Sequence, residues 1–104
     1  MTAMTLPRQG RAIAAGHGFR TAPYAVCTRH AGMTVLLDAR RGLYYTLNEL
    51  GWRIWDQLDA GAPVAAIIRT LCQEYCIPVS SFESDAVAFI ERLLDAELID
   101  AAAG

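Results

Sequence analysis

The sequence predicts a small α+β domain in which a three-stranded antiparallel meander precedes three helices. Short apolar and β-branched runs cover residues 24–30, 33–38 and 43–47, and turns containing Gly separate them. At Asn48 the apolar period changes from two residues to about 3.6, which is typical of a strand followed by a helix. With 104 residues, 54% of them hydrophobic, one core can form without disulfides or metal.

The three predicted strands follow one another closely. The run YAVCTRH turns at HAGM into MTVLLD, which turns again at ARRG into LYYTL, residues 43–47. The last strand of such a meander lies at the edge of the sheet unless another segment covers it. We therefore expect residues 43–47 to form an open edge strand.

Asn48 joins this edge strand to the first helix without a linker. Its side chain can accept hydrogen bonds from the first free amides of the helix. Gly61 supplies the C-terminal stop. Apolar residues recur between them at helical spacing: Leu47, Leu50, Ile54 and Leu58.

Two further helices are expected after Gly61. Pro63 suits the first turn of the second helix, which ends before Pro78. Ser80 and Glu83 have the spacing of a capping box and predict a third helix that extends to about residue 96. Its apolar positions cover more than one stripe, so we expect it to contact the core and a second surface. These positions are Phe82, Ala86, Val87, Phe89, Ile90, Leu93 and Leu94.

The two ends of the chain differ from this body. Residues 1–23 show no sustained periodicity and are expected to be a flexible tail; residues 24–99 form the domain, and residues 100–104 a C-terminal tail. After residue 23, six arginines stand against eleven acids, a balance of −5 that argues against nucleic-acid binding. The sequence has no run of about 18 apolar residues, no secretory signal and an odd number of cysteines, which favours a cytoplasmic protein without a membrane span.

No metal, cofactor or catalytic set is expected. Cys72 and Cys76 are four residues apart, but the other soft ligands, Cys27, His17 and His30, fall in a strand, the tail and a turn. We interpret Cys72 and Cys76 as packing residues. The sequence contains no glycine-rich phosphate loop and no credible Ser/His/Asp or Cys/His set, so an enzyme is not predicted.

The motifs LLD, a turn Gly, YY-x-LN, G-x-x-IW and the closing LLDAELI resemble, as a set, those of the PqqD-like family. Members are also called precursor-peptide recognition elements of RiPPs, which are ribosomally made, post-translationally modified peptides. The resemblance covers residues 24–99, and Glu97 departs from it because members often carry Gly just before the closing Leu-Ile. The matching positions are Leu36, Leu37, Asp38, Gly42, Tyr44, Tyr45, Leu47, Asn48, Gly51, Ile54, Trp55, Leu58, Asp85, Leu93, Leu98 and Ile99.

The resemblance implies a winged helix-turn-helix fold and a non-catalytic, leader-binding function. The leader of the precursor peptide would add antiparallel to the third strand, in the groove between it and the third helix. A short stand-alone chain looks most like the leader-binding protein of lasso-peptide gene clusters. Its implied partners are a cysteine-protease-like leader peptidase and an ATP-dependent cyclase, and the free protein is expected to be a monomer.

The candidate site on the edge strand follows from strand addition, in which backbone groups give affinity and side-chain pockets give specificity. Alternation places three residues on the inward face and leaves Tyr44 toward the flank or solvent. Without the resemblance, the tyrosines are ordinary strand residues. The strand candidates are Leu43, Tyr44, Tyr45, Thr46 and Leu47, of which Leu43, Tyr45 and Leu47 are the inward ones.

The candidate site on the third helix is a stripe at positions i, i+3, i+4 and i+7: Asp85, Ala88, Phe89 and Arg92. Ala88 is small and leaves room for a ligand, and the Phe89 ring supplies an apolar wall. The charges of the other two residues can orient a peptide. The alternative wall is Val87, Ile90 and Leu94; whichever stripe is not the wall belongs to the core.

The competing function is a winged-helix DNA-binding regulator with the third helix in the major groove. Residues 83–100 contain six acids and one Arg, a balance that repels phosphates. The charge pattern therefore favours the peptide-binding function.

Overall fold

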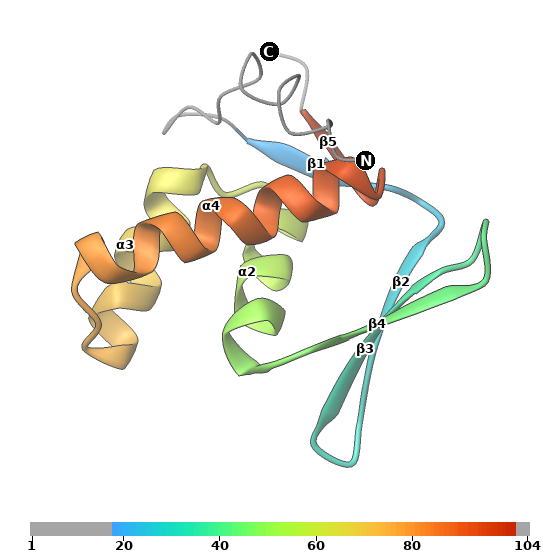
Figure 1. Ribbon diagram of the computed structural model, residues 1–104, viewed down its shortest axis with the longest axis horizontal. Helices are drawn as coiled ribbons and strands as arrows, with labels where there is room; N and C mark the ends of the chain where they lie inside the picture. Colours follow the sequence, from blue (N-terminus) through green and yellow to red (C-terminus); the bar gives the residue numbers. More distant parts are fainter. Residues whose placement is uncertain (1–17, 102–104) are drawn as a thin grey trace.

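The computed structural model describes residues 18–101. Within them the predicted α+β class is confirmed, since an antiparallel meander precedes the helices (Figure 1). The elements are β1 (Phe19–Thr21), β2 (Ala25–His30), β3 (Met33–Asp38), β4 (Leu43–Leu47), α2 (Glu49–Asp59), α3 (Val64–Tyr75), α4 (Val79–Asp95) and β5 (Ile99–Ala101).

The meander has the strand order β2-β3-β4. A two-residue loop joins β2 to β3, and both of its residues, Ala31 and Gly32, have positive φ angles of 53° and 79°. This is the backbone of a type I′ turn, whose twist matches that of the flanking strands. Gly adopts such an angle without a steric penalty, whereas Ala31 does not.

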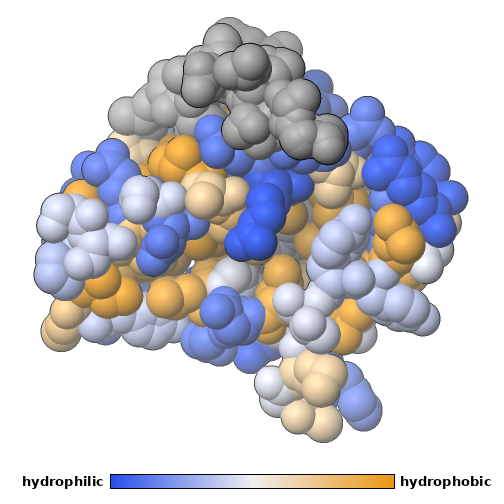
Figure 2. Space-filling model, viewed as in Figure 1, coloured by the Kyte–Doolittle hydropathy of each residue, from blue (hydrophilic) through white to orange (hydrophobic). Residues whose placement is uncertain are grey.

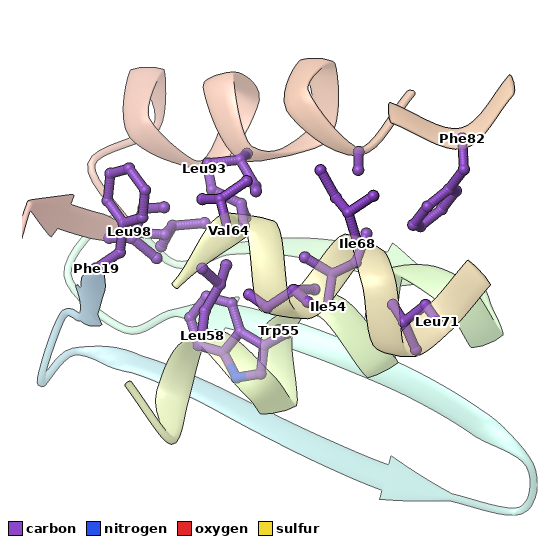
Figure 3. Close-up of a cluster of buried hydrophobic side chains, with 14 of the residues drawn as sticks. Phe19, Ile54, Trp55, Leu58, Val64, Ile68, Leu71, Phe82, Leu93 and Leu98 are labelled. Carbon is purple, nitrogen blue, oxygen red and sulfur yellow. The ribbon is translucent and has the colours of Figure 1, made fainter. Parts of the chain in front are cut away.

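The core lies mainly among the three helices, with α4 packed across α2 and α3 (Figures 1 and 3). Each helix turns one apolar stripe inward, as the 3.6-residue period predicts. Leu36 adds a fully buried hydrophobic side chain from β3. The most deeply buried side chains of the helices are Leu58, Ile67, Leu71 and Ile90.

Strand pairing extends beyond the predicted domain of residues 24–99 at both ends. Residues 19–21, expected to be tail, form β1 and pair antiparallel with β5, which extends into the expected C-terminal tail. Phe19 and Ile99, one from each strand, belong to the hydrophobic core, with exposed fractions of 4% and 2%. A three-residue strand is too short to show periodicity, so the sequence pattern missed it. The rest of the predicted tails, residues 1–17 and 102–104, lies outside the described residues.

The predicted helix ends are confirmed at α2 and α3. The Asn48 side chain accepts a hydrogen bond from the Gly51 amide at 2.8 Å, and Gly61 (φ 86°) follows the last turn of α2. The second helix ends at Tyr75, before Pro78. Cys72 packs in the core as predicted, but Cys76 is exposed in a left-handed conformation just beyond α3.

The predicted capping box at Ser80 is wrong. Helix α4 begins at Val79, and its N-cap is Pro78, which makes no side-chain cap. The Pro78 carbonyl accepts hydrogen bonds from the amides of Ser81 and Phe82, so the helix starts before Ser80 can cap it. None of the helices in the described part of the chain is long and apolar enough to cross a bilayer.

Candidate functional site

The outer edge of β4 is the first component of the candidate site. Among the described residues, β4 pairs with β3 on one side and with no strand on the other. The expectation of an open third strand in the meander is therefore confirmed within residues 18–101. An open edge presents backbone amides and carbonyls to any extended chain that approaches it.

The phase of the ladder identifies which backbone groups point outward. The two-residue loop is closed by the hydrogen-bonded pair His30 and Met33, and such pairs alternate along an antiparallel ladder. The hydrogen bond from the Ala39 amide to the Tyr24 carbonyl, at 3.0 Å, has the same phase. The backbone amide and carbonyl of Tyr45, opposite Leu36, therefore face β3. The amides and carbonyls of Tyr44 and Thr46 face outward.

The second component is a groove between β4 and α4. Its widest part, a hollow of about 550 Å³, lies beside Tyr45, Thr46 and Leu47 and is floored by apolar side chains. Two further hollows continue it past Asn48 and along the start of α2. Phe89 and Arg92 line all three hollows, so α4 forms one continuous wall. On the face shown in Figure 2, hydrophobic side chains lie between hydrophilic ones and do not merge into one patch.

One end of the groove is closed by a cluster of charges that ties the β3–β4 turn to the end of α4. Arg41 donates to the Glu97 carboxylate at 2.8 Å and to the Ala96 carbonyl at 3.1 Å. Arg40 donates to the same carboxylate at 3.2 Å and stacks on the Tyr24 ring at 4.1 Å. We name Tyr24, Asp38, Arg40, Arg41 and Glu97 the charge clamp.

Asp38 is the buried member of the charge clamp, with no exposed surface. Burial alone would raise the pKa of its carboxyl. Hydrogen bonds from the Arg41 and Arg40 amides and from the Arg40 guanidinium outweigh burial and lower the pKa below its ordinary value. The family-motif Asp therefore remains ionised and orders the turn.

Glu97 has a left-handed backbone (φ 62°) at the position where PqqD-like chains often carry Gly. The Glu97 amide bonds to the Leu94 carbonyl and the Leu98 amide to the Leu93 carbonyl, the pattern of a Schellman motif. Helix α4, whose last residue is Asp95, thus ends in a left-handed Schellman motif, the conformation that Gly adopts without strain. The ion pairs of Glu97 offset part of the cost of that conformation.

At the other end of the groove, the first turn of α2 approaches α4 closely. A Cβ atom added to Gly51 would lie 3.2 Å from Asn48 Oδ1 and 3.5 Å from the Phe89 ring. Asn48 and Gly51 line the groove, yet the sequence analysis gave them no binding role. The glycine in the first turn of α2 could have indicated this part of the groove, because such a glycine often marks close packing against another element.

The structure brings seven of the nine predicted site residues together. Tyr45, Thr46, Leu47, Asp85, Ala88, Phe89 and Arg92 all line the groove. Tyr44 is 72% exposed, as its predicted outward position requires. Leu43 was predicted to face inward, but it is 47% exposed and lines none of the hollows, which begin two residues further along β4, at Tyr45.

The two alternative stripes of α4 lie on different sides of the helix, and only one of them lines the groove. Ile90 is fully buried in the core, and Val87 lines a separate hollow against α3. The wall of the groove is the stripe with Phe89. The groove floor also includes Leu36, Leu93 and Leu98, three buried residues for which the sequence predicted no binding role.

The ion-pairing of charged residues differs between the groove and the clamp. Within residues 18–101, neither Asp85 nor Arg92 makes a side-chain hydrogen bond or ion pair, and both are exposed.

No three potential metal ligands come together in the described part of the chain. Burial raises the pKa of the Cys27 thiol, which disfavours the reactive thiolate.

Comparison with known proteins identifies the family. The family model described as coenzyme PQQ synthesis protein D (PqqD) matches residues 33–99. The chain belongs to the PqqD family. The resemblance predicted from the sequence motifs is thus confirmed, and a search of curated proteins finds no match.

Two solved structures resemble this PqqD-family chain along most of its length. One is TbiB1 in complex with the TbiA(beta) leader peptide, with 28% identity and a TM-score of 0.72; the match covers 82% of this chain and 99% of TbiB1. The other is a lasso peptide synthetase B1 complexed with the leader peptide, with 28% identity and a TM-score of 0.71; it covers 78% of this chain and 95% of that protein.

Proposed function

We propose that this chain is a non-catalytic module that binds the leader region of a ribosomal precursor peptide of the lasso-peptide class. The open edge of β4 beside the groove is the observation that supports this most directly. An extended leader would satisfy the outward amide and carbonyl of Thr46 and place alternate side chains in the groove. The two structural relatives, which were solved with leader peptides, support the same function.

The bound leader would then be delivered to a cysteine-protease-like leader peptidase and an ATP-dependent cyclase. A module that holds the leader raises the effective concentration of the cleavage site near the peptidase. Three free cysteines and the family membership support a cytoplasmic site of action. The DNA-binding alternative is not favoured, because the exposed side of α4 carries acids and the relatives are peptide complexes.

The test is a fluorescence-polarisation titration of the full chain. The probe is a fluorescein-labelled synthetic leader from the short precursor reading frame that the proposed function predicts next to the gene for this chain. Saturable binding is expected with the natural chain. In Phe89→Ala, the dissociation constant should rise about tenfold, because the ring is the apolar wall of the groove.

Val87→Ala is the matched control. Val87 lies on α4, two residues from Phe89, but lines the hollow against α3 and not the groove. It should bind the leader as the natural chain does, with both variants checked for folding by circular dichroism. Absence of saturable binding to the natural chain, or equal losses in the two variants, would contradict the proposed function.

A further inference from the structure

We infer that Asp85 and Arg92 select leaders of one charge order, with a basic residue preceding an acidic one. This inference rests on the proposed function and specifies its ligand. The first observation is that the two side chains are exposed on the groove wall without ion-pair partners in the described part of the chain. By contrast, five other arginines in residues 18–101 form ion pairs: Arg20, Arg29, Arg40, Arg41 and Arg53.

The two charges border different lengths of the groove. Asp85 lies at the hollow next to Asn48, whose other lining residues are mainly apolar. Arg92 borders all three hollows. Asp95, which also lines the widest hollow, already has an interaction partner. An incoming peptide therefore meets one anion and one cation along this wall, neither of them ion-paired with any residue in the range 18–101.

The direction of the peptide follows from the fold. The hollow at Asp85 adjoins Asn48, and the hollow at Ala96 adjoins Tyr45, so α4 runs antiparallel to β4 (Figure 1). A chain added antiparallel to β4 runs parallel to α4. Its N-terminal part passes Asp85 and its C-terminal part passes Arg92, which places the basic residue first.

The spacing follows from the rise of each element. Asp85 and Arg92 are two helical turns apart, or about 10.5 Å along the axis of α4. A strand rises about 3.4 Å per residue, so this length corresponds to about three residues of leader. Because alternate side chains face the groove, the two charges are two or four residues apart. If the two charges are four leader residues apart, the middle one of the three intervening residues also faces the groove, beside Phe89.

The test exchanges charges on both partners. The probe is the same fluorescein-labelled synthetic leader, together with a copy in which the basic and acidic residues are interchanged. Arg92→Glu should weaken binding of the natural leader about fivefold to tenfold. The double variant with Asp85→Arg and Arg92→Glu should prefer the interchanged leader, which recovers most of the lost affinity.

Arg69→Glu and Glu83→Lys are the matched controls. Both residues line the hollow on the other side of α4 and make no ion pair within the described residues. They change the net charge by the same amount as reversal of Arg92 and Asp85, so they measure the effect of overall charge. Neither should alter the preference between the two leaders.

Two results would overturn the inference while the proposed function stands. One is saturable binding of the natural leader that Arg92→Glu weakens no more than Arg69→Glu. The other is a double variant that does not distinguish the two leaders. If the natural chain itself shows no saturable binding, the proposed function fails, and the inference fails with it.

Discussion

The two faces of α4 differ in what their side chains contact. Ile90 is fully buried in the core, whereas its neighbour Phe89 is half-buried and lines the groove. The buried face is apolar in its core positions, and on the groove face Asp85 and Arg92 have no ion-pair partner within residues 18–101. The comparison indicates that one helix stabilises the fold with one face and leaves the other available to a ligand.

The same contrast separates the two ends of the groove wall. At the clamp, Arg40 and Arg41 are both paired with Asp38 and Glu97 and fix the turn of the hairpin. Earlier on α4, Asp85 and Arg92 have no such partners in the described part of the chain. The presence or absence of an ion-pair partner therefore distinguishes charges that stabilise the fold from charges that are available to a ligand.

The largest expected effect is on the buried face of α4. Ile90→Ala should lower the free energy of unfolding by about 2–5 kcal/mol, because it removes a fully buried side chain and leaves a cavity. Urea denaturation followed by circular dichroism measures this loss. Phe89→Ala is the comparison variant and should lose less, since its ring is partly exposed. The reverse order would show that the two faces have been assigned to the wrong roles.

Backbone pairing at β4 gives the next largest effect. Thr46→Pro removes an outward amide without breaking the pairing with β3, so the chain should fold while leader binding weakens about tenfold or more. Thr46→Val keeps the amide and is the control. Equal affinity of the two variants in the polarisation titration would contradict strand addition at this residue. Proline at Tyr45 is less informative, because that amide faces β3 and its loss would disturb the fold.

Much of this architecture could be predicted from the sequence because it depends on local periodicity. The strand runs, the Asn48 cap and the Gly61 stop were all recognisable in the printed residues. The pairing of β1 with β5 was not, since it joins two three-residue segments about 80 positions apart in the chain. The exposure of Leu43 was also missed, because alternation indicates the face on which a residue lies and not whether another element covers that face.

The smallest expected effect concerns the clamp at Glu97. Glu97→Ala loses the ion pairs to Arg40 and Arg41 and keeps the strained left-handed backbone, whereas Glu97→Gly loses the same pairs and removes the strain. The Gly variant should therefore be more stable than the Ala variant by about 1 kcal/mol in urea denaturation. Since exposed ion pairs are worth little, the Gly variant should remain within about 1 kcal/mol of the natural chain. Equal stability of the Gly and Ala variants would mean that Glu97 is not strained, and the end of α4 would then need a different explanation.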